Sequence, residues 1–139
     1  MLSNYDIRVA FRCIKKLRSF IPSPKDPVPP FSRCGVVYEI KCKDCDNKYI
    51  GQTKNSLNTR LQQHKAALRL CQPDKSAIAE HAICTGHQIN WTDPKVLDRE
   101  SRWRHRLFLE AWHTNAASEQ CLNRCECFLP TVYRALFIS

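Results

Sequence analysis

The chain has 139 residues, 43% of them hydrophobic, which suits one domain with a packed core and is too short for two. Its 22 Lys and Arg residues outnumber 13 Asp and Glu, and the resulting net charge of +9 favours contact with polyanions. No apolar run is long enough to span a membrane and basic residues interrupt the N-terminal hydrophobic positions, so we expect an intracellular protein without membrane contact.

The N-terminal part predicts a helix followed by a linker. Residues 4–20 carry apolar side chains at helical spacing between arginines and lysines: Ile7, Phe11, Ile14 and Leu17. Residues 21–30 contain five prolines, which remove backbone donors and favour extended chain. We therefore divide the chain into residues 1–32, an amphipathic helix with a Pro-rich linker, and a domain at residues 33–139.

The domain begins with the pattern of a β-hairpin. Residues 36–42 (VVYEIKC) are rich in β-branched and aromatic side chains and predict a strand. Residues 43–47 (KDCDN) have the composition of a turn. Residues 48–53 (KYIGQT) predict a second strand that pairs with the first.

Two helices are expected next. Residues 56–70 show an apolar stripe of Leu57, Leu61 and Leu68, with Ser56 as N-cap. Residues 76–87 predict a shorter helix that Ser76 begins and Gly86 closes in the left-handed conformation.

A third strand at residues 95–100 and a third helix at 101–114 follow, and then a loose tail containing Pro130. The order β-β-α-α-β-α predicts an α/β (α+β) fold, a small three-stranded antiparallel sheet flanked by helices.

Two polar residues occupy the apolar face of the helix at 56–70. His64 lies between Leu61 and Leu68, and Arg60 sits one turn earlier at the edge of that face. A histidine there is either a hydrogen-bonded core residue or part of a functional site.

A carboxylate occupies an equivalent position on the helix at 101–114. Glu110 falls between Leu107 and Ala111, on the face that Trp103 also shares. A buried carboxylate needs a cation, so Glu110 either forms a structural ion pair with an arginine or binds a metal.

The cysteines point to a metal rather than to disulfides, because nine is an odd number and no export signal is visible. Cys42 and Cys45 stand in the turn with the spacing of zinc ligands, and His81 and His87 supply a second pair. These four residues predict a closed structural Zn²⁺ site that ties the hairpin to the second helix. Cys84 is a competing ligand, and the alternative is that none of these residues binds metal.

Two short motifs, the segment Gly35-Val36-Val37-Tyr38 and an intact YIG at Tyr49-Ile50-Gly51, precede Arg60, His64 and Glu110 in the sequence. Through these residues the chain resembles the GIY-YIG nuclease family over about residues 33–133. The stretches GVVYEIKCKDCDNKYIGQT, SAIAEHAICTGH, VLDRE and LFLEAW look like the endonuclease domain of Penelope-like retroelements, where it follows a reverse transcriptase. This resemblance makes residues 1–32 the tail of an upstream reverse transcriptase and implies a nuclear location. It also matches the ligand set Cys42, Cys45, His81 and His87.

The resemblance implies a role for each matched residue. Glu110 would hold a single divalent cation, Mg²⁺ or Mn²⁺, and Arg60 would bind the scissile phosphate. Tyr38, Tyr49 and His64 would move protons and orient groups, with the general base undecided among them.

Asn123 matches an asparagine that supports the family's active site, although it could equally satisfy its own loop. The nearby Cys125 and Cys127 depart from the family pattern, which puts activity rather than the fold in question.

The leading hypothesis is a metal-dependent endonuclease that nicks target DNA for target-primed reverse transcription. The alternative is a catalytically inactive, zinc-stapled nucleic-acid-binding module derived from such a nuclease. A restriction or repair nuclease of the same fold is a third possibility, against which the cysteine pair argues.

Overall fold

The computed structural model describes residues 27–117 and 120–123. The helix expected at residues 4–20, most of the linker and the tail with Cys125, Cys127 and Pro130 lie outside these residues. Within them, no helix is both long and apolar enough to cross a membrane.

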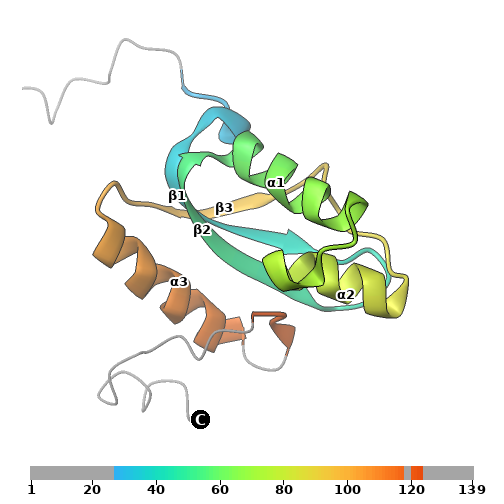
Figure 1. Cartoon of the computed structure of the whole chain (residues 1–139). Coiled ribbons are helices and arrows are strands. Elements are labelled where there is room, and N and C mark those ends of the chain that lie inside the picture. The colour runs from blue at the N-terminus through green and yellow to red at the C-terminus, as the bar shows by residue number, and fades with distance from the viewer. Residues whose placement is uncertain (1–26, 118–119, 124–139) are drawn as a thin grey trace, which may run out of the picture.

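The sheet has three antiparallel strands, β1 (Cys34–Lys41), β2 (Lys48–Ser56) and β3 (Lys95–Arg99), in the order β2-β1-β3 (Figure 1). The hairpin and the third strand predicted from the sequence are therefore confirmed. Because β1 lies in the centre, β2 has one edge that pairs with no strand of the sheet.

Over residues 27–117, three α-helices accompany the sheet: α1 (Leu57–Arg69), α2 (Ala77–Thr85) and α3 (Trp103–Ala117). The 3-10 helices η3 (Pro30–Ser32) and η4 (Pro73–Lys75) precede β1 and α2. The predicted caps are present. The hydroxyls of Ser56 and Ser76 accept the backbone N–H groups of Thr59 and Ala79, and Gly86 ends α2 with a left-handed φ of 72°.

The core lies between one face of the sheet and helices α1 and α2. Val36, Tyr38 and Ile40 alternate along β1 and pack against apolar side chains of the two helices: Leu57, Leu61, Ile78 and Ala82. Helix α3 packs on the opposite face of the sheet (Figure 1). There the Arg106 side chain donates a hydrogen bond to the Gln52 side chain of β2.

The buried side of α3 differs from the prediction. Trp103 and Leu107, expected to share a buried face with Glu110, are exposed, and the most buried residues of the helix are Arg106 and Ala111. Arg106 is 2% exposed, and its guanidinium donates to the Gln52 side-chain oxygen and to two backbone carbonyls. An arginine can be buried at this position because three oxygen atoms accept hydrogen bonds from its guanidinium.

Candidate active site and metal centre

The two motif tyrosines lie on the core face of the hairpin. In the strand register Tyr38 is opposite Gly51 and Ile40 is opposite Tyr49, so both rings project towards α1 with centroids 6.2 Å apart. A Cβ atom at Gly51 would lie 2.8 Å from the Tyr38 hydroxyl oxygen and 2.7 Å from Cε1 of Tyr49. The glycine of the YIG motif is therefore required for both rings to cross the strand this closely.

His64 joins the tyrosines to helix α2. Its Nε2 lies 2.8 Å from the Tyr38 hydroxyl oxygen, and its Nδ1 lies 2.7 Å from the hydroxyl oxygen of Ser76. The imidazole is 1% exposed. Burial, and secondarily the charge of Arg60, lowers the pKa of His64 to about 4, so the ring is neutral at pH 7.

Arg60 supplies the positive charge next to this chain of hydroxyl and imidazole groups. Burial opposes its charge, but contacts with the Tyr38 and Tyr49 hydroxyls outweigh this effect and raise the pKa of Arg60. One terminal nitrogen donates to the Gln63 side chain at 2.9 Å. The buried Nε has no hydrogen-bond partner, which is costly unless an anionic oxygen binds there.

Both tyrosines remain protonated at neutral pH. Burial raises the pKa of Tyr38, and the neighbouring Tyr49 raises it further, while Arg60 acts in the opposite direction. Burial is also the main reason that the pKa of Tyr49 is raised. Tyr38 is fully buried, whereas the Tyr49 residue is partly exposed.

Glu110 reaches this site around the free edge of β2. Its carboxylate accepts the backbone N–H of Gln52, and burial raises its pKa, opposed by Arg60 and by that N–H group. The carboxylate in turn raises the pKa of both tyrosines, which places its charge near their hydroxyls. The charge of Glu110 therefore acts on the tyrosines although α3 packs on the other face of the sheet.

Asn123 occupies the same edge two residues away along β2. Its side-chain oxygen accepts the Ile50 N–H at 3.0 Å, and its amide nitrogen donates to the Ile50 carbonyl at 2.6 Å and to the Thr114 hydroxyl at 3.1 Å. The Leu122 N–H also bonds to the Lys48 carbonyl at 2.9 Å. Asn123 thus fixes the strand directly after Tyr49 and ties it to α3.

The structural ion pair considered for Glu110 does not form with Arg60. Among the described residues, the salt bridges within 4.0 Å involve Glu39, Glu100 and Asp98, and none involves Arg60 or Glu110. The Glu110 carboxylate and the Arg60 guanidinium therefore influence each other's charge without forming a salt bridge.

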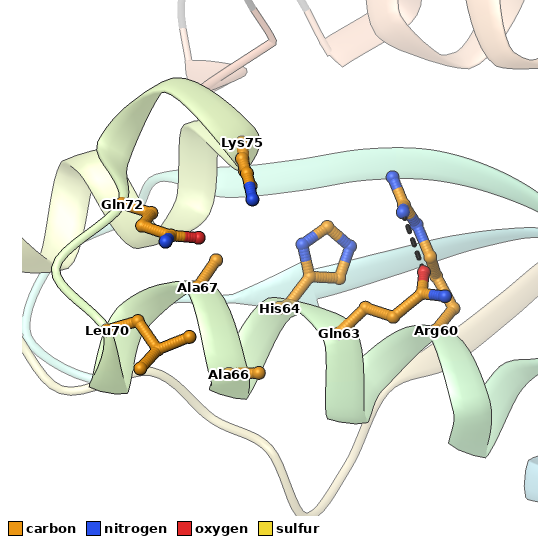
Figure 2. Close-up of a pocket in the computed structure, with 8 residues that line it drawn as sticks. All are labelled: Arg60, Gln63, His64, Ala66, Ala67, Leu70, Gln72 and Lys75. Atoms are coloured by element: carbon orange, nitrogen blue, oxygen red, sulfur yellow. Dashed lines mark hydrogen bonds between the residues drawn. The ribbon is translucent and has the colours of Figure 1, made fainter.

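Two hollows meet at Arg60. One, of about 500 Å³, runs between α1 and η4 past His64 to Lys75, and Figure 2 shows its lining. The other, of about 450 Å³, lies between the end of β2, α1 and the start of α3. Arg60 and Gln63 line both hollows, so the two hollows adjoin at these residues.

The four predicted zinc ligands form a cluster. The ligand atoms of Cys42, Cys45, His81 and His87 all lie within 4.8 Å of one another, whereas Cys84 is exposed and outside the group. The Cys45 sulfur is 3.5 Å from His81 Nε2, which is 3.3 Å from His87 Nδ1. Tetrahedral zinc at its usual bond lengths separates such atoms by about 3.5 Å and about 3.3 Å, so the residues fit this metal.

The backbone brings this cluster together. Cys42 forms a β-bridge with Ile89, and the N–H of Lys43 bonds to the carbonyl of Gln88 at 2.9 Å. The Asp44 carboxylate also accepts the Gln88 N–H at 2.6 Å. These bonds hold the hairpin turn against the segment after α2, which carries His87.

Two residues near the candidate site, Ser76 and Arg106, have contacts that the sequence pattern does not predict. Ser76 was identified as a helix cap, but its second contact with His64 was not. Arg106 was not singled out, although it precedes Glu110 by one helical turn and this spacing places both on one face.

A comparison with known protein families identifies the family of this domain. The family model described as the GIY-YIG catalytic domain matches residues 34–104, just over half of the chain. No curated protein and no solved structure gives a significant match. The matched segment contains both tyrosines, Arg60 and His64, and it ends before Glu110 and Asn123, which the fold adds to the same site. The chain belongs to the GIY-YIG family of nuclease domains.

Proposed function

We propose that this domain is a divalent-metal-dependent endonuclease that nicks DNA. The observation that carries the proposal is that Arg60, whose Nε has no partner, and the Glu110 carboxylate lie near the same hydrogen-bonded tyrosine–histidine pair without forming a salt bridge to each other. Hydrolysis of a phosphodiester requires a cation that binds the phosphate oxygens, a ligand for the catalytic metal and an acceptor for the proton of the attacking water. The active site would consist of Tyr38, Tyr49, Arg60, His64, Glu110 and Asn123.

The acidic group fits a single hydrated cation. Glu110 belongs to no cluster of three or more His, Cys, Asp or Glu side chains among the described residues, so it would offer Mg²⁺ or Mn²⁺ one protein ligand. Mg²⁺ binds in this way, because it keeps several waters and takes its other ligands from phosphate. A bound cation would also offset the burial that raises the Glu110 pKa. When bound, it supplies Lewis-acid stabilisation of charge on the phosphate and the leaving oxygen.

Arg60 would hold the scissile phosphate through its free Nε and a terminal nitrogen. The planar guanidinium matches two phosphate oxygens at once, which a lysine cannot do. The contacts with both tyrosine hydroxyls fix the direction of the fork before substrate arrives.

The proton of the attacking water would leave through the tyrosines. Tyr49 is the partly exposed end of the chain, Tyr38 is the buried middle, and His64 Nε2 is the acceptor at the far end. Tyr49 would take the proton of the water and give its own proton to Tyr38, which would give its own to His64 Nε2. Neither tyrosine would therefore become a phenolate. Phosphate bound at Arg60 would offset the positive charge that lowers the His64 pKa and make the imidazole a better base.

The Cys42, Cys45, His81 and His87 cluster would bind a structural Zn²⁺. All four positions of the tetrahedron are protein ligands, so such a site is closed and performs no hydrolysis itself.

The biological setting that we propose is a retroelement protein of the Penelope-like type. The domain would nick target DNA in the nucleus and supply a 3′ end to an upstream reverse transcriptase. The motif stretches around the hairpin, α2 and α3 support this setting. The alternative, an inactive DNA-binding module, predicts the same fold and charge without nicking.

A plasmid-nicking assay with Mg²⁺ tests the proposal. Glu110→Ala should abolish nicking while DNA affinity stays nearly unchanged, because arginines and lysines supply most of that affinity. Arg60→Lys should lower the nicking rate by about 100-fold through loss of the bidentate fork. Asp93→Ala, at an exposed carboxylate before β3, is the matched control and should nick like the wild type. Wild-type nicking by Glu110→Ala would refute the mechanism and favour the binding module.

A further inference from the structure

The two hollows that meet at Arg60 lie on either side of the proposed phosphate position. The larger follows α1 to η4 and the smaller follows the end of β2 to the start of α3. Arg60 and Gln63 form the ridge between them, and their side chains are hydrogen-bonded. A DNA strand whose scissile phosphate contacts Arg60 therefore has one neighbouring nucleotide over each hollow.

The smaller hollow combines an aromatic platform with positive charge. Trp103, the first residue of α3, is 60% exposed and is the only aromatic among the described residues that line the hollow. Lys54 and Arg106 line the same hollow. Unpaired nucleotides bind to exposed aromatic rings that lie next to cations. The base stacks on the ring, and the cations attract the charged phosphate backbone.

The larger hollow has an apolar floor and polar walls. Figure 2 shows the Lys75 amine and the Gln72 amide facing α1 across the hollow. The floor is formed by small and aliphatic side chains of α1 and its C-cap: Ala66, Ala67 and Leu70. An ammonium group suits a phosphate, and an amide above an apolar floor suits the edge of a base.

We propose that these hollows form a track for unpaired DNA, with a base stacked on Trp103 on one side of the scissile phosphate and Lys75 at a phosphate on the other. The preferred substrate is then DNA that is single-stranded or locally open at the nick, because bases in a duplex are already stacked on their neighbours. This inference rests on the proposed nuclease function for the position of the phosphate.

The other use of Trp103 would be protein docking. Leu107 and Phe108 on the same helix are also exposed, at 38% and 37%, and could extend an apolar surface. The positive charge beside Trp103 and the shared ridge with the active site favour DNA as the occupant.

Binding measurements on uncut DNA test the stacking. A bubble DNA and its matched duplex are titrated with Trp103→Ala, Trp103→Phe and Leu107→Ala, each in the Glu110→Ala background. Both DNAs carry fluorescent aminopurine at the positions that are unpaired in the bubble. Trp103→Ala should weaken binding to the bubble about 10-fold or more and bind the duplex almost as the parent does. Trp103→Phe should restore most of the affinity and quench the aminopurine, and Leu107→Ala should match the parent. Because Trp103 is exposed, melting temperatures should agree across the set.

Equal losses on bubble and duplex, or no loss on either, would overturn the proposal. So would equal losses for Trp103→Ala and Leu107→Ala, which would indicate a general apolar surface. The background is inactive by design, so these results do not depend on cleavage. Conversely, Mg²⁺-dependent nicking that Glu110→Ala abolishes would support the nuclease even if Trp103 proved irrelevant.

The second half of the track has its own measurement. Lys75→Ala should reduce the slope of log affinity against log salt by about one on the bubble DNA, as expected for one lost phosphate contact. Lys95→Ala, which removes an exposed lysine at the start of β3, is the matched control and should leave the slope unchanged. Identical slopes for the two variants would overturn the contact assigned to Lys75.

Discussion

The cysteine–histidine cluster and the tyrosine–arginine–glutamate site are built differently although α2 serves both. In the cluster, the four ligand atoms face one another at the separations of a tetrahedron. In the candidate active site, Arg60 keeps a buried donor without a partner and forms no salt bridge with the Glu110 carboxylate. One ion would complete the first arrangement, whereas the second would stay incomplete until a substrate binds. Changes in the first should therefore damage stability, and changes in the second should damage chemistry.

The largest effect is expected at the cluster. Cys42→Ser should lower the free energy of unfolding by several kcal/mol and reduce bound zinc, because binding energy at a structural site is folding energy. Cys84→Ser, at an exposed cysteine of α2 outside the cluster, is the matched control and should melt like the wild type. Metal analysis and thermal melts with and without a chelator measure both. Zinc-free protein whose melting ignores the chelator would remove the metal centre.

A second expected effect concerns the acid stability that His64 confers. Its pKa falls from the usual 6.5 to about 4 in the fold, so between these values the unfolded chain binds more protons than the native one. The contribution is complete above pH 6.5 and is lost as the pH falls towards 4, a change of at most roughly 3 kcal/mol.

Urea unfolding of the wild type and of His64→Gln across this range isolates the effect. The His64→Gln curve should fall less steeply with decreasing pH, and His105→Gln, at an exposed histidine of α3, should follow the wild type. Parallel curves for all three proteins would show that His64 is not buried as a neutral ring.

A comparison of two glycines separates strain at the site from strain at a helix end. Gly51→Ala should destabilise the domain by about 1–3 kcal/mol and impair nicking, since its Cβ would press against both tyrosine rings. Gly86→Ala should cost about 1 kcal/mol through its left-handed φ, with nothing within 4 Å of the new Cβ, and leave nicking intact. Equal activity losses in the two variants would contradict this distinction.

The smallest effect is expected at Glu110 and has the opposite sign. Burial raises the pKa of this carboxyl above its unfolded value, so its contribution to stability is favourable at low pH and is lost as the pH rises. At pH 7 without divalent cations, Glu110→Gln should therefore raise the melting temperature slightly, and added Mg²⁺ should narrow the difference by stabilising the wild type alone. A lower melting temperature for the variant in both conditions would make Glu110 a structural residue.

Much of this organisation could be predicted because it depends on local patterns. Strand composition, the serine caps and the glycine at the end of α2 identified the elements, and ligand spacing identified the metal cluster. Helix α3 was less predictable. Its apolar residues are divided between an exposed face and a buried one, and the buried arginine depends on carbonyls of the preceding turn, which no periodicity reveals.

The contact between Ser76 and His64 was hidden for another reason. Each residue has an ordinary local explanation, a helix cap and a core histidine, and only the packing of α2 against α1 brings them within 2.7 Å. The reach of Glu110 around the β2 edge is likewise a property of the sheet order, which the linear sequence does not specify.

The outer edge of β2 has a consequence for self-association. An open strand edge offers unpaired N–H and C=O groups to any other extended chain, and proteins commonly block such edges. Here the backbone of Leu122 and the side chains of Asn123 and Glu110 bind the groups of Lys48, Ile50 and Gln52 that face outward. The residues that shape the active site therefore also prevent strand addition. A copy of this domain that loses Asn123 or ends before it would expose an unpaired strand edge that can pair with another chain. Such copies should aggregate as well as lose activity.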